Sequence, residues 1–115
     1  MVFKKAQIKN ITKKAVAELK SYISIDAVYL FGSYSTGRAT NYSDIDLAFV
    51  SDAFKKMDDY SRSKLLMKAL DRINLPEPKD IEPVGLTKKE FKNPKKFSLA
   101  SQIKKSGKVV FIKKH

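Results

Sequence analysis

Two runs of β-forming residues, separated by a polar loop, constrain the fold more than any other feature of this chain. The first run, AVYLF at residues 27–31, ends at Gly32, which indicates a strand that stops at a sharp turn. The second run, DIDLAFV at residues 44–50, alternates and then becomes wholly apolar, as a central strand does. The loop between them, residues 33–43, contains mainly small and polar residues and predicts a turn with one helical turn.

The rest of the chain adds helices and two more strands. Apolar residues recur at three- and four-residue intervals across residues 6–22 and again across residues 56–74, which predicts two amphipathic helices. Residues 80–86 are predicted to form a strand at a sheet edge or strand end, because Pro83 cannot donate to a hydrogen-bond ladder. A final strand is predicted at residues 108–112.

The region before the final strand is expected to be helical. Thr87 and Glu90 have the spacing of a capping box, and a further helix is expected from Phe97 to a stop at Gly107. The resulting order predicts an α/β fold, namely a small mixed β-sheet of about four strands with helices packed mainly on one side.

The composition fits a single domain that spans residues 1–115, with 43% apolar residues. Cysteine is absent, which excludes disulfides and thiolate metal sites and is compatible with the cytoplasm. No apolar run approaches the ~18 residues that cross a bilayer, and the N-terminus lacks the apolar segment of a signal peptide. We therefore expect a cytoplasmic protein with no membrane partner.

The charge of the chain points to a polyanionic partner. The formal net charge is +12, from 24 Lys+Arg against 12 Asp+Glu, and the lysines gather toward both ends of the chain. Nucleic acid, a nucleotide or an acidic protein surface would suit this charge. Arginine is the residue that favours specific phosphate recognition, and the chain has only Arg38, Arg62 and Arg72. The lysines are therefore either a solvated surface or a true electrostatic footprint.

Asp44 and Asp46 are the residues that suggest a catalytic site. Side chains two residues apart on a strand point to one face, with Cα atoms ~6.5–7 Å apart. Two such carboxylates repel each other unless a cation lies between them. A pair of divalent ions bridged by carboxylates is the arrangement for in-line displacement at phosphorus, and Mg²⁺ is the ion that this chemistry favours.

Gly32 and Ser33 supply a place for phosphate groups. Glycine at a strand end lets the backbone approach a ligand, and a helical turn that begins at Ser33 would present N–H groups and a hydroxyl to polyphosphate. Arg38 and Ser43 lie in the same loop and are further candidates to bind these phosphates. The alternative for Arg38 is a solvent-exposed loop residue, and for Ser43 it is a cap or turn residue at the strand entry.

The segment GSYSTGRATNYSDIDL, residues 32–47, resembles the signature of the polymerase-beta-like nucleotidyltransferase superfamily, specifically its minimal nucleotidyltransferase (MNT) branch. Gly32 and Ser33 match the Gly-Ser pair of that signature, and Asp44 and Asp46 match its Asp-x-Asp. The resemblance implies the nucleotidyltransferase fold, ATP as substrate, and two Mg²⁺ ions held by these aspartates and a third acid on a later strand.

The third acid has two candidates, Glu82 and Asp80, which point to the same face if residues 80–86 form a strand. The Ile-Glu-Pro sequence around Glu82 resembles the family pattern more closely, so we favour Glu82 and keep Asp80 as the alternative. By resemblance, this residue would help to bind the catalytic metal and would accept the proton of the attacking hydroxyl.

The resemblance also implies a partner. MNT proteins of this size are typically encoded beside a helical protein of the HEPN type, an RNase toxin. The implied function is that of an antitoxin, which transfers AMP from ATP to a tyrosine of the HEPN-type toxin. Two alternatives remain open: a silent antitoxin that acts by binding only, and a nucleic-acid-binding module or RNA-end nucleotidyltransferase, which the net charge of +12 favours.

Overall fold

The computed structural model describes residues 1–114, and His115 lies outside the described part of the chain. Its centre is a mixed four-stranded sheet with the order β3-β2-β1-β4. β1 runs antiparallel to β2 and to β4, whereas β3 runs parallel to β2. The strands are β1 (Ala27–Phe31), β2 (Ile45–Val50), β3 (Ile81–Leu86) and β4 (Lys108–Ile112).

The strands agree closely with the sequence prediction. The predicted strands at residues 27–31 and 108–112 have the observed bounds, and the other two begin one residue later, at Ile45 and Ile81. β3 lies at one edge of the sheet, as Pro83 predicted, and β2 is central. The mixed four-stranded sheet expected from the sequence is therefore confirmed.

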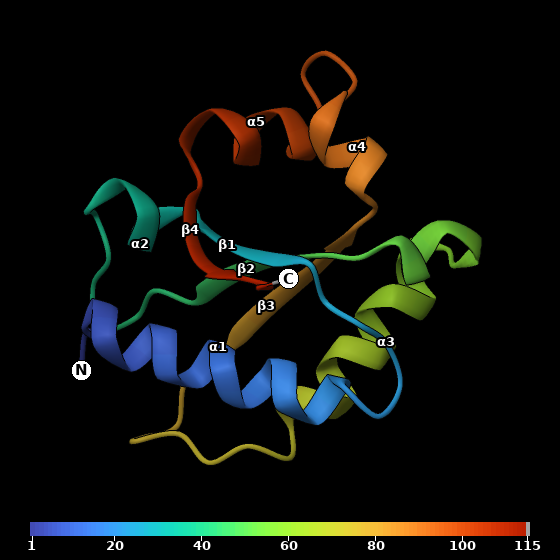
Figure 1. Cartoon of the computed structure of the whole chain (residues 1–115). Coiled ribbons are helices and arrows are strands. Elements are labelled where there is room, and N and C mark those ends of the chain that lie inside the picture. The colour runs from blue at the N-terminus through green and yellow to red at the C-terminus, as the bar shows by residue number, and fades with distance from the viewer. Residues whose placement is uncertain (115) are drawn as a thin grey trace.

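Two long helices, α1 (Lys5–Leu19) and α3 (Asp59–Leu70), cover one face of the sheet and enclose the larger core (Figure 1). Alternate residues of β2 point into this core because side chains on a strand alternate between its faces. The core residues contributed by α1, β2 and α3 include Ile8, Ile11, Ala15, Leu19, Ile45, Leu47, Phe49 and Leu66.

Two short helices, α4 (Lys88–Lys92) and α5 (Leu99–Ser106), lie over the opposite face (Figure 1). A smaller buried cluster joins them to the sheet, and the ring of Tyr29 stacks on that of Phe91 with centroids 4.4 Å apart. The members of this cluster are Ala48, Leu86, Ala100 and Ile103. The main helical layer is thus on one side, as expected, and α4 and α5 add a second, smaller layer.

The helix ends differ from the prediction where local caps decide them. The first helix ends at Leu19 and leaves Tyr22 51% exposed beyond it. Residues 52–56 form a separate 3-10 turn, η1 (Asp52–Lys56), and α3 begins later because the Asp58 side chain accepts a hydrogen bond from Ser61 N at 2.8 Å. No helix within residues 1–114 is long and apolar enough to cross a membrane.

The predicted capping box at the start of α4 is confirmed. Glu90 N donates to Thr87 Oγ1 at 3.1 Å, and Thr87 N donates to Glu90 Oε1 at 2.8 Å. This box does more than begin a short helix, because it holds the Glu90 carboxylate where an arginine of α3 can reach it.

That arginine, Arg62, is 7% exposed and ties α3 to η1, β3 and α4. Its guanidinium donates to three backbone carbonyls, those of Phe54 at 2.8 Å, Met57 at 3.0 Å and Gly85 at 3.0 Å. It also pairs with Glu90 Oε1 at 2.6 Å. These acceptors satisfy the buried charge of the Arg62 guanidinium, so Arg62 has a structural role. Arg62 and these partners are called the Arg62 clamp below.

Candidate active site

Gly32 ends β1 directly beside Asp46 of β2. The register pairs Phe31 with Asp46, and Gly32 then turns with φ +72°. A Cβ at Gly32 would lie only 2.1 Å from Asp46 Oδ2, so any side chain there would displace the Asp46 carboxylate. Both the backbone angle and the close approach therefore favour glycine.

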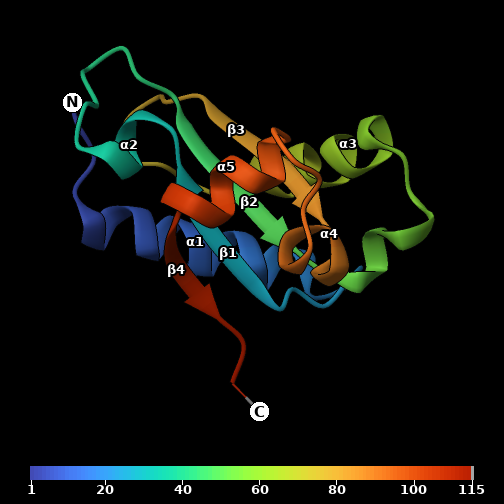
Figure 2. The same cartoon turned by 90° about the horizontal axis from the view of Figure 1, so that it is seen from above.

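The turn at Gly32 leads into α2 (Ser33–Thr36), a single turn of helix that starts next to the acidic strand. The Gly32 carbonyl accepts hydrogen bonds from Ser35 N at 3.1 Å and Thr36 N at 3.2 Å. The first N–H groups of a helix have no partner within it, so this turn presents donors at the end of the sheet where β1 stops and β2 starts. Figure 2 shows α2 beside the start of β2, with α5 crossing the sheet nearby.

The three favoured acids lie on one face of the sheet. Asp46 is the register partner of Glu82 on the parallel strand β3, and Asp44 is two residues before Asp46. Ala48 and Val84 come two residues after Asp46 and Glu82 and therefore point to the same face of the sheet. Both pack in the cluster under α4 and α5. The acids therefore face the α4–α5 side, with Asp44 and Asp46 half-buried and Glu82 exposed. Gly32, Asp44, Asp46 and Glu82 are called the acidic corner below.

The acids of this corner influence one another electrostatically. Partial burial, and then the negative charges of Asp44 and Glu82, raise the pKa of Asp46 above its ordinary value. None of the ion pairs formed within residues 1–114 involves these three acids. The corner therefore carries uncompensated negative charge that a bound cation would neutralise.

Asp80, the alternative third acid, has a different place. It comes before β3, its side chain is exposed, and its carbonyl accepts a hydrogen bond from Ile45 N at 3.0 Å. The charge that reaches Asp46 from this segment is that of Glu82. The geometry therefore favours Glu82 over Asp80.

The remaining loop candidates divide into two groups. The carbonyl of Ser33, the half-buried first residue of α2, accepts from Arg38 N at 2.9 Å. The Arg38 side chain is exposed to solvent beside this turn. The Ser43 hydroxyl accepts from Thr40 N at 2.8 Å, so it is engaged in the turn that precedes β2. Ser33 and Arg38 thus remain candidates to bind phosphate, and Ser43 has the turn role that the sequence offered as its alternative.

The match to known families agrees with this geometry. The model of the family "Polymerase beta, Nucleotidyltransferase" matches residues 13–115. The chain belongs to this nucleotidyltransferase family. Among curated proteins, none matches the chain.

Solved structures share the fold of this nucleotidyltransferase. A Sulfolobus solfataricus nucleotidyltransferase has a TM-score of 0.64 at 21% identity, covering 94% of this chain and 83% of that one. A toxin–antitoxin structure with AMP-PNP has a TM-score of 0.58 at 28% identity, covering 91% and 73%. A Shewanella oneidensis complex, described as a tri-AMPylated HEPN toxin with MNT antitoxin, has a TM-score of 0.55 at 24% identity, covering 96% and 74%.

The donor set of this nucleotidyltransferase suits Mg²⁺. Within residues 1–114, no three acidic, histidine or cysteine side chains gather tightly enough to enclose a metal by themselves. Mg²⁺ usually binds one or two carboxylates and completes its shell with water and substrate phosphates, so an open set of carboxylates fits it. The missing Cβ at Gly32 leaves the space that the Asp46 carboxylate occupies.

One residue that orders the site was not found from the sequence. Lys79 Nζ donates to the Asn41 carbonyl at 3.0 Å and lies 5.9 Å from the ring centroid of Tyr34. It thereby ties the loop that carries Asp44 to α2. A lysine in a proline-containing connector gives no sequence sign of this contact, because its partners lie far away along the chain.

Proposed function

We propose that this nucleotidyltransferase transfers AMP from ATP to a tyrosine hydroxyl of a HEPN-type toxin, and that it thereby acts as the antitoxin of the pair. The observation that carries the proposal is the acidic corner, where Asp46 lies between the Gly32 turn and Glu82. The toxin–antitoxin structure with AMP-PNP, at 28% identity, supports both the nucleotide and the setting. The AMP groups on the HEPN toxin of the Shewanella complex support the acceptor class.

Each residue of the corner has a role in this proposal. Asp44, Asp46 and Glu82 would hold Mg²⁺, and the bound ion would neutralise the charge that develops on the phosphates. The N–H groups at Gly32 and Ser33 would bind the β- and γ-phosphates at the start of α2. Arg38, which is exposed beside that turn, could reach the same phosphates. Catalysis would then consist mainly of positioning and charge neutralisation.

The reaction is a displacement at the α-phosphorus. The tyrosine phenol oxygen forms a bond to the α-phosphorus while the bond from this phosphorus to the bridging oxygen breaks. Pyrophosphate leaves with that electron pair. The phenol proton passes to Glu82, whose exposed carboxylate lies on the open edge strand β3.

Labelling of the partner tests the proposal. The chain is incubated with α-³²P-labelled ATP, Mg²⁺ and the helical protein encoded by the neighbouring gene, and transfer is followed on a gel. We expect the wild-type chain to label that protein and Asp44→Asn to abolish the label without unfolding the chain. Asp80→Asn is the matched control, because it removes the same charge close to β3, and it should label normally.

Two outcomes would contradict the proposal. Unchanged labelling by Asp44→Asn would remove the role of the acidic corner in catalysis. Formation of a stable complex with no label from either the wild-type chain or the variant would instead identify an antitoxin that acts by binding only.

A further inference from the structure

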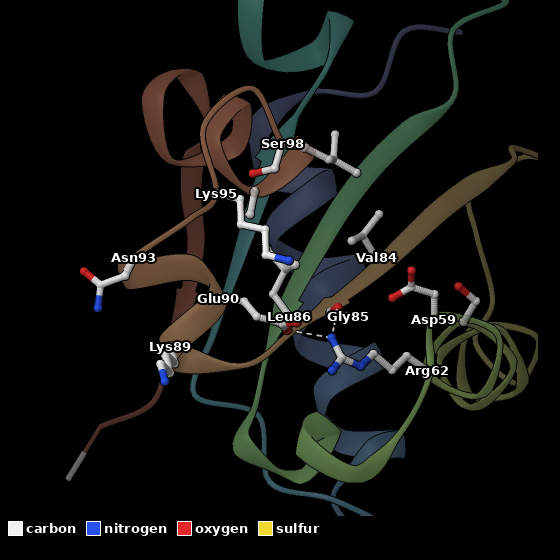
Figure 3. A pocket seen from close by; sticks show the side chains of 13 residues that line it. Asp59, Arg62, Val84, Gly85, Leu86, Lys89, Glu90, Asn93, Lys95 and Ser98 are labelled. Atoms are coloured by element: carbon white, nitrogen blue, oxygen red, sulfur yellow. Dashed lines mark hydrogen bonds and ion pairs between the residues drawn. The ribbon is translucent and has the colours of Figure 1, made fainter.

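A hollow of about 570 Å³ lies at the β3 edge of the sheet, between α3 of one helical layer and the α4–α5 loop of the other, and is not used by the proposed nucleotide site. Its floor is the second half of β3, and its walls come from α3 on one side and from α4, α5 and their connecting loop on the other (Figure 3). The volume is within the ~300–1,000 Å³ range of ligand pockets. Val84 in the floor is two residues after Glu82, which is ~6.5–7 Å along the strand.

The direction of the proposed reaction points to this hollow. In-line displacement puts the leaving group and the attacking oxygen on opposite sides of the phosphorus. The leaving phosphates would lie at Gly32, where β1 ends, and the sheet order then runs through Asp46 on β2 to Glu82 on β3. With the phosphates so placed, the attacking hydroxyl would arrive from the β3 side, where the hollow lies.

The residues that line the hollow indicate what kind of group could bind there. Val84, Leu86 and Leu99 give it apolar surfaces, and Leu99 is 45% exposed. Lys89 and Lys95 lie on its α4–α5 side and Asp59 on its α3 side, and Figure 3 shows the Lys95 side chain extending across the hollow. An apolar floor beneath lysines suits an aromatic or aliphatic side chain that is flanked by acidic residues.

The surface beside the hollow favours a protein over a small molecule. Phe97, in the loop before α5, is 86% exposed and has φ +62°, a strained conformation for a bulky residue. Lys96 Nζ lies 5.3 Å from the centroid of this ring. Phe97 directly precedes Ser98 and Leu99, which line the hollow, and its exposed ring adds apolar surface that a small ligand in the hollow would not cover.

We infer that the hollow between α3, β3 and the α4–α5 loop binds the acceptor segment of the partner protein, an acidic stretch that carries the tyrosine to be modified. This inference rests on the proposed function, because the tyrosine oxygen is the nucleophile of that reaction. The segment lies over Val84 and Leu99, its acidic residues pair with Lys89 and Lys95, and its tyrosine points along β3 toward Glu82.

Two variants and two matched controls test the inference by transfer kinetics with the neighbouring-gene product. Lys95→Glu reverses a rim charge, and Leu99→Asp puts a carboxylate into the hollow at the first position of α5, where helices accept one. Lys9→Glu makes the same charge change on α1 at the other face, and Leu99→Met keeps the apolar side chain. All four are first checked for unchanged thermal unfolding.

We expect each pocket variant to raise the KM for the partner at least about tenfold, the ratio that corresponds to ~1.4 kcal/mol. Both controls should keep the wild-type KM. Affinity for an ATP analogue with a methylene bridge between the α- and β-phosphorus, measured calorimetrically with Mg²⁺, should be the same in all five proteins.

The contradicting results are distinct. An unchanged KM in both pocket variants overturns the inference, and so does loss of analogue affinity, which would assign the hollow to the nucleotide. Binding of a short single-stranded RNA that only the pocket variants weaken, with an unchanged KM for the partner, also overturns it. If the wild-type chain transfers nothing, the proposed function fails, and calorimetric titration of the partner then decides whether its segment docks here.

Discussion

Charged side chains are paired at one end of β3 and unpaired at the other. At its second half, Gly85 and the adjoining α4 meet the Arg62 clamp, where a buried guanidinium is matched by carbonyls and Glu90. At its start, Glu82 joins Asp44 and Asp46, and these three acids form no ion pair within residues 1–114. The paired charges of Arg62 and Glu90 stabilise the fold. The unpaired negative charges of the acidic corner lower its stability, as expected of residues arranged to bind a ligand.

The largest expected effect comes from removing one charge of the acidic corner. Asp46→Asn should lower the rate of AMP transfer about a thousandfold, or ~4 kcal/mol of transition-state stabilisation. Stability should not fall, because burial and its acidic neighbours already disfavour the Asp46 charge. Transfer rates of the purified variant check the expected loss of activity, and its thermal unfolding checks the expected stability. A variant that loses stability together with activity would make Asp46 a structural residue.

The converse change breaks the clamp. Arg62→Met should lower the free energy of unfolding by about 3 kcal/mol, because it leaves buried carbonyls without donors. Urea denaturation measures this effect. Arg72→Met is the control, since Arg72 is exposed just beyond α3 and its loss should change stability by less than ~0.5 kcal/mol. Equal effects at both arginines would refute the structural role of the clamp.

Two glycine variants test whether the close contact between Gly32 and Asp46 matters for activity. Gly32→Ala should reduce AMP transfer about a hundredfold, ~2.7 kcal/mol, because the new Cβ displaces the Asp46 carboxylate. Gly37 also has positive φ, at +76°, but a Cβ there meets nothing within 4 Å. Gly37→Ala should therefore carry only the backbone penalty, about 1–2 kcal/mol of stability, and keep its activity when folded. Similar activity in the two variants would show that contact with Asp46 is unimportant.

The smallest expected effect is a difference in pH dependence. Burial alone would raise the pKa of Glu90, but hydrogen bonds from Thr87 and Arg62 outweigh it and hold this pKa below its ordinary value. Its stabilising contribution is therefore present above the pKa of an unfolded glutamate and is lost as pH falls through the folded pKa. The pKa of Asp46 is raised, so protonation of Asp46 adds stability as pH falls.

Urea titrations between neutral and acidic pH check these opposite signs. Glu90→Gln should flatten the loss of stability at low pH, whereas Asp46→Asn should steepen it, because the gain from protonating Asp46 is gone. The same slope in the wild-type chain and in both variants would contradict the contrast between the clamp and the corner.

The sequence predicted the parts of the fold that local patterns determine. The strands at residues 27–31 and 108–112 were found with their bounds, because β-forming runs there end at turns or glycines. The capping box at Thr87 was found because both its partners lie within one turn. Helix ends were less accurate, since the 3-10 turn at residues 52–56 depends on the packing of Phe54 and not on periodicity.

The parts that depend on contacts between distant segments could not be predicted. Arg62 was one arginine among three, and its partners at Gly85 and Glu90 come from elements far along the chain. The strand register that sets Glu82 opposite Asp46 is likewise invisible to composition and spacing. The Gly-Ser and Asp-x-Asp pattern nevertheless indicated the corner, because phosphate chemistry requires a close backbone turn beside paired carboxylates.

Calorimetric titration with the methylene-bridged ATP analogue tests the central claim most directly, namely that the acidic corner binds nucleotide through Mg²⁺. The wild-type chain should bind the analogue with Mg²⁺, and either a chelator or Asp46→Asn should weaken binding at least about tenfold. Asp80→Asn should bind as the wild type does. Equal affinity with and without Mg²⁺, or in the Asp46→Asn variant, would contradict the claim.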